Sequence, residues 1–182
     1  MGLQIVKPTI AQLRELIGAT KADDRPRHSC SLYPAGFAAG SFIELTGSQR
    51  TEFTAQFLSE NPELKVAWVE ESITINPYAL KQKGVCLDNI LFIEGKKDLA
   101  WCLNQVLGSG CFQIVVTENS RFHEKDLRRF QLLSEKAQNH FFLLSANPTP
   151  SWVPHLQLKT SKVKYQGQDH WSVHALRKRG AL

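Results

Sequence analysis

The sequence predicts an α/β fold with a mainly parallel sheet flanked by helices and a C-terminal antiparallel hairpin. Up to residue 145, apolar segments of strand length alternate with amphipathic segments of helix length, the order typical of parallel strands joined by helical crossovers. After residue 155, two alternating segments flank a glycine-containing turn, which is typical of a hairpin at a sheet edge. With 182 residues, 42% of them hydrophobic, the chain is long enough for one domain with a core.

A short helix and a linker are expected before the domain. Thr9 and Gln12 have the spacing of a capping box, which predicts a helix over residues 9–17. Residues 21–28 are polar and contain a proline, the composition of a linker. We therefore expect an N-terminal helix and linker over residues 1–28 and a single domain over residues 29–182. The apolar face of the predicted helix carries Ile10, Leu13, Leu16 and Ile17.

The first half of the domain contains three predicted strands and two predicted helices. The second helix has the clearest boundaries. Asn76 stands at its N-cap, Pro77 at its first helical position, and Gly84 ends it in the left-handed conformation. Strands are predicted over residues 42–45, 66–69 and 90–93, and the first helix over residues 51–58.

The second half begins with a helix over residues 99–107, with Asp98 as the N-cap and Gly108 as the end. The strand over residues 112–117 has almost no polar residues, which indicates a central parallel strand covered on both faces. The remaining elements are a helix over residues 122–138, a strand over 141–145, and hairpin strands over 155–159 and 171–177 around a turn at 165–168.

Two segments of the chain resemble the RecA family. RecA-type sequences have a strand, an acid, Asp-Pro, a six-residue spacer, Gly-Val and then Asp-Asn. This chain has a strand and an acid followed by Asn76-Pro77, a six-residue spacer, Gly84-Val85 and Asp88-Asn89. Around the first strand, Gly36, Gly40, Glu44 and Gly47 also match the family's pattern. The resemblance extends from about residue 36 to about residue 177 and implies a RecA-like core with a C-terminal hairpin.

The resemblance implies a phosphate-binding loop after the first domain strand, and this loop is altered. The family has four spacer residues after a glycine, then a second glycine, a lysine and a hydroxyl residue, which together hold phosphates and magnesium. In this register Glu52 and Phe53 occupy the positions of the second glycine and the lysine. Deleting three residues instead aligns Arg50 and Thr51 with the lysine and the hydroxyl residue, in a loop too short to enclose a β-phosphate. The residues of this degenerate loop are Gly47, Ser48, Gln49, Arg50 and Thr51.

The two acidic groups of the implied ATP site are also altered. Thr117 stands where the family has its magnesium-binding aspartate, and Glu118 is one residue late, which on a strand turns a side chain to the other face. Ser72 stands where the family has its catalytic glutamate, although Glu70 and Glu71 are nearby. We therefore predict a chain that is not an enzyme and has no nucleotide cofactor and no metal.

The C-terminal segment carries the net positive charge. Residues 155–182 hold six basic residues and one acid, Asp169, so their net charge is 6 − 1 = +5, the formal charge of the whole chain. This asymmetry suggests an anionic partner such as DNA; the alternative is a solvated strand pair with a basic tail. The basic residues are Lys159, Lys162, Lys164, Arg177, Lys178 and Arg179.

Two apolar features are candidate partner sites. Trp152 lies in a proline-rich loop and is either an interface anchor or a lid on the domain's own core, of which we favour the lid. The apolar face of the N-terminal helix, with Leu13, Leu16 and Ile17, packs either on its own domain, which is our default expectation, or on a partner.

Zinc binding and secretion are not expected. His170 and His174 have a spacing that suits zinc ligands on a helix, but in an alternating strand they share one exposed face with Ser172. The chain has no apolar run of the ~20 residues that a membrane helix needs and no apolar signal region, so we expect a cytoplasmic protein. The cysteines show no C-x-x-C spacing and are expected to be buried free thiols: Cys30, Cys86, Cys102 and Cys111.

A compact RecA-like chain with an altered ATP site is similar to two bacterial families. ImuA is an accessory of SOS-induced error-prone translesion synthesis, and SulA is an SOS inhibitor of division that binds the tubulin-like ring protein. The retained glycine and Asn-Pro motifs are closer to ImuA, and the two connections that carry DNA-binding loops in RecA are short here. The resemblance implies a non-catalytic adaptor that binds recombinase (RecA) or translesion polymerase subunits. The alternatives are a SulA-type division inhibitor and a DNA-binding RecA paralogue.

Overall fold

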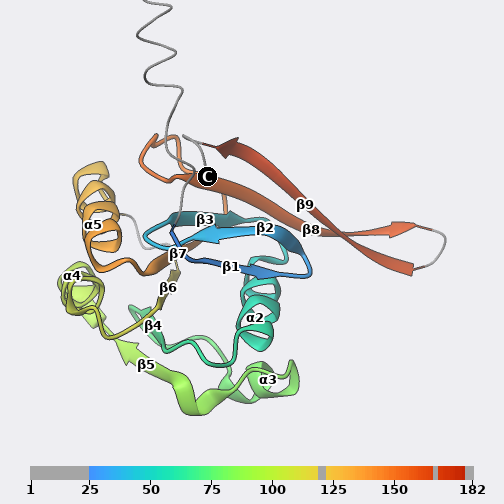
Figure 1. Cartoon of the computed structure of the whole chain (residues 1–182), viewed down its shortest axis with the longest axis horizontal. Coiled ribbons are helices and arrows are strands. Elements are labelled where there is room, and N and C mark those ends of the chain that lie inside the picture. The colour runs from blue at the N-terminus through green and yellow to red at the C-terminus, as the bar shows by residue number, and fades with distance from the viewer. Residues whose placement is uncertain (1–24, 119–121, 166–167, 179–182) are drawn as a thin grey trace, which may run out of the picture.

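A seven-stranded, mostly parallel sheet with helices on both faces forms the centre of the molecule (Figure 1). This computed structural model describes residues 25–118, 122–165 and 168–178. The strand order is β5-β4-β6-β7-β3-β8-β9, and only the β8–β9 pair is antiparallel. The predicted helix over residues 9–17, with Leu13, Leu16 and Ile17, and also Arg179, lie outside the described residues.

The elements follow the predicted alternation. The strands are β1 (Arg27–Cys30), β2 (Tyr33–Ala38), β3 (Phe42–Thr46), β4 (Val66–Glu70), β5 (Ile90–Glu94), β6 (Ile114–Glu118), β7 (His140–Ser145), β8 (Leu156–Tyr165) and β9 (Gln168–Lys178). The α-helices are α2 (Arg50–Glu60), α3 (Pro77–Gln82), α4 (Leu99–Ser109) and α5 (Glu124–Ala137), with short 3₁₀ turns at Leu87–Asn89 and Lys96–Asp98.

The sheet separates two apolar cores, because alternate residues of each strand point to opposite faces. In β4, for example, Trp68 packs on the α2 side, whereas Ala67 and Val69 pack on the side of α4 and α5. Figure 1 shows α4 and α5 together on one side of the sheet. All residues of β3, β4 and β7 are buried, which is why these strands appear in the sequence as apolar runs.

The ends of α3 confirm the expected capping, and the end of α4 corrects it. The Asn76 side chain accepts a hydrogen bond from the backbone N–H of Tyr78 at 2.9 Å, and Gly84 has a φ of 84°. Asp98 occupies the N-cap position of α4 without a side-chain cap bond. The prediction that Gly108 ends α4 is wrong: the helix continues to Ser109, and Gly110, with φ 68°, is its left-handed cap.

A two-stranded sheet of β1 and β2 was not predicted from the sequence. The expectation of a linker over residues 21–28 is wrong at its end, because Arg27 and His28 belong to β1. The small sheet contacts the large one through Phe37, which packs on Phe142, and through His28, whose Nδ1 lies 2.9 Å from Nε2 of His140 on β7. His140 is buried among phenylalanine rings, and burial lowers its pKa to about 3, so this imidazole is neutral near neutral pH.

The connection from β7 to β8 crosses over β3 without a helix. Parallel strands are usually joined through a helix, but residues 146–155 make this crossover as an extended loop. Glu44, fully buried on β3, fixes the loop: its carboxylate accepts hydrogen bonds from the N–H and Oγ1 of Thr149 at 2.9 and 3.2 Å, and from Nε2 of Gln157. The crossover therefore leaves a gap beside α5 that a helix would have filled.

Candidate functional site

The altered ATP-site elements lie at the carboxyl ends of β3, β4 and β6. This edge of a parallel sheet is where open α/β proteins bind ligands. Residues 47–49 form the loop between β3 and α2, Ser72 follows β4, and Thr117 lies near the end of β6. The structure thus places the three predicted elements at the same edge of the sheet.

The loop after β3 is closed by β8. Gly47 has a φ of 91°, and a Cβ atom at this position would overlap the backbone carbonyl of Thr160. The N–H of Gln49, one of the amides that a phosphate loop would present to its ligand, donates to the Thr160 carbonyl at 3.4 Å. Ser48 is exposed, and Thr51 is half-buried in the first turn of α2. Strand β8 therefore lies where an open phosphate cradle needs free space.

Arg50 is neutralised by the chain itself. Its Nη2 donates to Oε1 of Glu118 at 2.7 Å, and its Nη1 donates to the carbonyl of Gly47 at 3.2 Å. Glu118 is the last residue of β6, and its carboxylate reaches across to Arg50. Thr117 is fully buried, and its hydroxyl donates to the backbone carbonyl of Glu118 at 3.3 Å. The only cation of the degenerate loop is thus paired with a carboxylate instead of facing an open site.

The residues that strict alignment places at the second glycine and the lysine have structural roles. Phe53 is fully buried on the α2 side of the sheet. Glu52 contacts Nζ of Lys162 at 2.7 Å and Nζ of Lys83 at 3.6 Å, and the hydrogen bond from Lys162 is the main cause that lowers the pKa of this carboxyl. Neither position offers the cation or the open backbone that a triphosphate requires.

The two acids at the end of β4 have different environments. Glu70 is buried and accepts hydrogen bonds from Nε1 of Trp68 at 2.7 Å and from the N–H and Oγ1 of Thr74 at 2.6 and 3.0 Å. These bonds hold the carboxylate within its own turn. Glu71 and Ser72 are both exposed.

The basic residues of the hairpin do not gather on one face. Lys162 lies on the α2 side, pairs with Glu52 and has its Nζ 5.1 Å from the ring centre of Trp171. Lys159 is opposite His174 in the β8–β9 register and therefore points to the other face of the hairpin. The guanidinium of Arg177 donates to the carbonyl of Ser151 and so ties β9 to the crossover loop. Lys164 and Lys178 are exposed at opposite ends of the hairpin.

Trp152 lies on the surface of the crossover loop, so the expectation that it is a lid on the core is wrong. Its side chain is 52% exposed, whereas the neighbouring Val153 is fully buried and performs the core-filling role. The guanidinium of Arg128, on α5, lies 5.6 Å from the centre of the Trp152 ring. Trp152 therefore remains a candidate interface residue.

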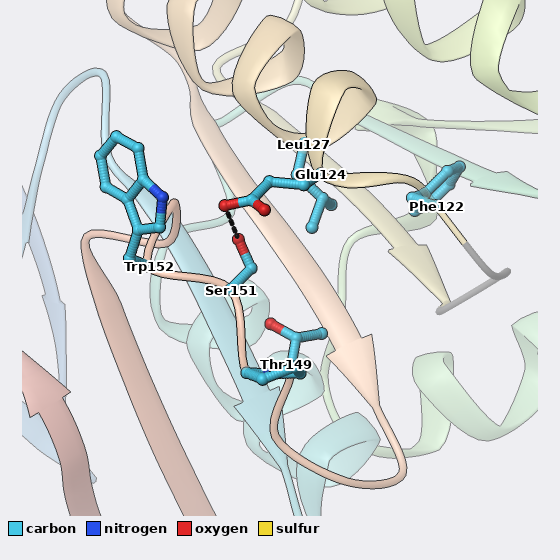
Figure 2. Close-up of a pocket in the computed structure, with 7 residues that line it drawn as sticks. Phe122, Glu124, Leu127, Thr149, Ser151 and Trp152 are labelled. Carbon is cyan, nitrogen blue, oxygen red and sulfur yellow. Dashed lines mark hydrogen bonds between the residues drawn. The ribbon is translucent and has the colours of Figure 1, made fainter.

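A groove of about 350 Å³ lies between the start of α5 and the crossover loop (Figure 2). Sequence reasoning did not identify it. The signal was indirect: the ten residues from 146 to 155 are too few and too rich in proline for a crossover helix, so one side of α5 is left uncovered. The groove, called the α5 groove below, is lined by Phe122, Glu124, Leu127, Thr149, Pro150, Ser151 and Trp152.

The two histidines of β9 share an exposed face, as expected, whereas the expectation of buried cysteines holds for Cys30 alone among the four. His170 and His174 are exposed on β9, and Nε2 of His174 lies 2.7 Å from Oγ of Ser172 on the same face. The described ranges contain no group of three side chains suited to hold a metal ion. All four cysteines are free thiols, of which Cys30 is buried and Cys111 is exposed. Within the same ranges, no helix has the length and apolar character needed to cross a membrane.

Comparison with known proteins shows the fold. No family model matches the sequence, and no curated protein matches it. Among solved structures, the chain is similar to the flagellar accessory protein FlaH from Methanocaldococcus jannaschii, with a TM-score of 0.60 and 11% identity over 86% of this chain and 89% of that chain. Together with the parallel sheet and its C-terminal hairpin, this similarity shows a RecA-like fold. At such low identity it carries no information on activity.

Proposed function

We propose that this chain is a non-catalytic, RecA-like adaptor of the bacterial DNA damage response. It binds a recombinase or error-prone polymerase components during translesion DNA synthesis, and it works in the cytoplasm. The RecA-like fold supports the class of partner, because RecA-like cores assemble side by side. A RecA-like chain that does not hydrolyse ATP can dock on the end of a recombinase filament without contributing ATP hydrolysis to it. The similarity of residues 36–47 and 76–89 to ImuA supports the pathway.

The Arg50–Glu118 ion pair is the single observation that carries the non-catalytic part of this proposal. It joins the first residue of α2 to the end of β6 at 2.7 Å, at the edge of the sheet where a RecA-type protein holds its nucleotide. An ATP-bound state would have to break this pair and also displace β8 from Gly47. Both changes oppose nucleotide binding in the folded protein.

The partner is tested by affinity capture. Tagged full-length protein is incubated with lysate from DNA-damaged bacteria, treated with nuclease, and the captured proteins are identified by mass spectrometry. Recovery of the recombinase or a translesion polymerase subunit supports the adaptor function. Recovery of the tubulin-like ring protein instead identifies a SulA-type division inhibitor, and overexpression should then cause filamentous cells.

Direct DNA binding is the weaker alternative, because the basic side chains are divided between the two faces of the hairpin and two of them, Lys162 and Arg177, are bonded within the protein. A single-strand binder would lose affinity with salt with a slope of about −0.7 per phosphate contact. Replacing Arg177, Lys178 and Arg179 together would then reduce that slope by about two units. An unchanged slope excludes these residues as phosphate contacts.

A further inference from the structure

The α5 groove combines apolar walls with one acidic group. Leu127 is 3% exposed and forms the floor, while Phe122 and Trp152 line opposite ends (Figure 2). Glu124 on α5 and Ser151 on the crossover loop face each other across the groove. Their atoms Oε1 and Oγ are 3.5 Å apart, a weak contact that leaves most of the carboxylate's hydrogen-bonding capacity unused. Among the described residues that line the groove, Glu124 is the one with a charged side chain.

This charge favours a cation over a phosphate. Glu124 lies in the first turn of α5, where its negative charge already complements the positive end of the helix dipole. An anionic ligand would be repelled by the carboxylate, whereas a guanidinium or ammonium group gains a charge-assisted hydrogen bond. The aromatic groups at the ends also suit a cation with an alkyl stem.

Two arginines close to the groove are engaged elsewhere. Arg128, one turn after Glu124, has its guanidinium over the Trp152 ring, and its Nη1 donates to Oε1 of Gln131 at 2.6 Å. The Arg177 guanidinium, which also reaches the crossover loop, is bonded to the backbone carbonyl of Ser151. Within the described part of the chain, neither arginine is among the residues that line the groove, so neither takes the place of a ligand in front of Glu124.

We propose that the α5 groove binds an arginine or lysine side chain of a protein partner, next to an apolar residue that covers Leu127 and Phe122. The cationic group pairs with Glu124, and its alkyl stem lies along the aromatic side chains. This inference rests on the proposed adaptor function and names the kind of peptide segment that such a partner would present. Nothing in it involves the degenerate ATP site.

The test uses the full-length protein and the indole N–H signals of its four tryptophans in ¹H–¹⁵N NMR spectra. The probe is the blocked peptide acetyl-Leu-Arg-Leu-amide. The matched control peptide has citrulline in place of arginine, which is similar in shape but uncharged. Trp152→Phe assigns the Trp152 signal, and Trp101→Phe is its control, because Trp101 is similarly exposed, at 62%, but lies on α4. We expect the arginine peptide to shift the Trp152 signal and to bind about five- to tenfold more tightly than the citrulline peptide.

Glu124→Gln keeps the size of the side chain and should abolish the preference for arginine over citrulline, whereas Glu63→Gln, at an exposed site, should preserve it. Equal binding of both peptides, no shift of the Trp152 signal, or a shift caused only by oligo-dT would each overturn the inference. The outcomes separate it from the proposed function. If affinity capture recovers the partner but the peptide does not bind, only the groove inference fails; if the peptide binds but no recombinase or polymerase subunit is captured, the adaptor function fails.

Discussion

The Nη2 atom of Arg50 lies 2.7 Å from Oε1 of Glu118, so an ion pair joins the start of α2 to the end of β6. The two residues are 68 positions apart in the chain and are brought together by the parallel sheet. They occupy the edge where a RecA-like ATPase would hold phosphate and magnesium. The Arg50 guanidinium is therefore paired with a carboxylate of the same chain, whereas a RecA-like ATPase uses the cation at this edge to bind phosphate.

The first prediction concerns the stability that this pair provides. Because the Arg50 and Glu118 side chains are 24% and 43% exposed, solvent screens the interaction, and a double-mutant cycle with Arg50→Ala and Glu118→Gln should give a coupling of about 0.5–1 kcal/mol. Urea unfolding of the wild type, the two single variants and the double variant measures it. Additive effects of the two substitutions would show that the pair contributes nothing.

The second prediction concerns Glu44, the buried carboxylate that fixes the crossover loop. Glu44→Gln places an amide NH₂ group against donors from Thr149 and Gln157, so buried donors lose their acceptor. We expect a loss of about 2–4 kcal/mol in the free energy of unfolding, measured by urea denaturation. Glu63→Gln, at an exposed position, should change it by less than about 0.5 kcal/mol. Similar small effects at both positions would show that Glu44 does not hold the loop.

The third prediction concerns acid sensitivity from His140. Burial lowers the pKa of this imidazole from 6.5 to about 3, so the unfolded chain binds the proton more readily than the folded protein. The contribution of neutral His140 to the free energy of unfolding is therefore fully present above pH 6.5 and is lost as the pH falls from 6.5 toward 3. Between about pH 7 and pH 5, the decrease in unfolding free energy should be smaller in His140→Phe than in the wild type by about 2 kcal/mol. An equal decrease in both proteins would show that His140 does not cause the acid sensitivity. Because His140→Phe also removes the contact with His28, the same measurement on His28→Phe shows how much of the difference comes from losing that contact.

The fourth prediction concerns Glu52, whose pKa is lowered mainly by the hydrogen bond from Lys162. A carboxyl with a lowered folded-state pKa stabilises the protein above its unfolded pKa, and the stabilisation is lost as the pH falls through the folded-state value. The folded-state pKa of Glu52, measured by NMR titration, should lie below 4.5 in the wild type and rise toward it in Lys162→Gln. The partial exposure of the pair limits the effect on stability to about 0.5 kcal/mol. A Glu52 pKa unaffected by Lys162→Gln would exclude the pairing in solution.

Sequence patterns predicted the sheet because its central strands are buried on both faces and appear as apolar runs, and because the caps at Asn76 and Gly84 are local. They did not predict β1 and β2, since these strands are short and contain Pro34 and Gly36. The hairpin strands are longer than predicted: β8 continues from the buried Thr160 to Tyr165. The polar residues that interrupt the apolar alternation of this segment are Ser161, Lys162 and Lys164.

The candidate site was predicted only in part, for a physical reason. The motif positions follow from spacing along the chain, and the structure places the loop after β3, Ser72 and Thr117 at one edge of the sheet. Contacts between side chains on different strands depend on strand order and register, and neither can be predicted from residues that are close together in the sequence. For this reason the Arg50–Glu118 pair, the closure of the Gly47 loop by β8 and the α5 groove all required the structure.

The most direct test of the non-catalytic account is equilibrium binding of a fluorescent N-methylanthraniloyl ATP analogue with magnesium. Wild-type protein, Arg50→Ala and Glu118→Gln are titrated in parallel, and the Glu118→Gln variant is included because it frees Arg50 from its carboxylate partner. We predict no saturable binding to any of the three up to about 1 mM nucleotide. Saturable binding to the wild type with a Kd below about 100 µM, lost in Arg50→Ala, would contradict the account and show that the loop after β3 still holds a triphosphate.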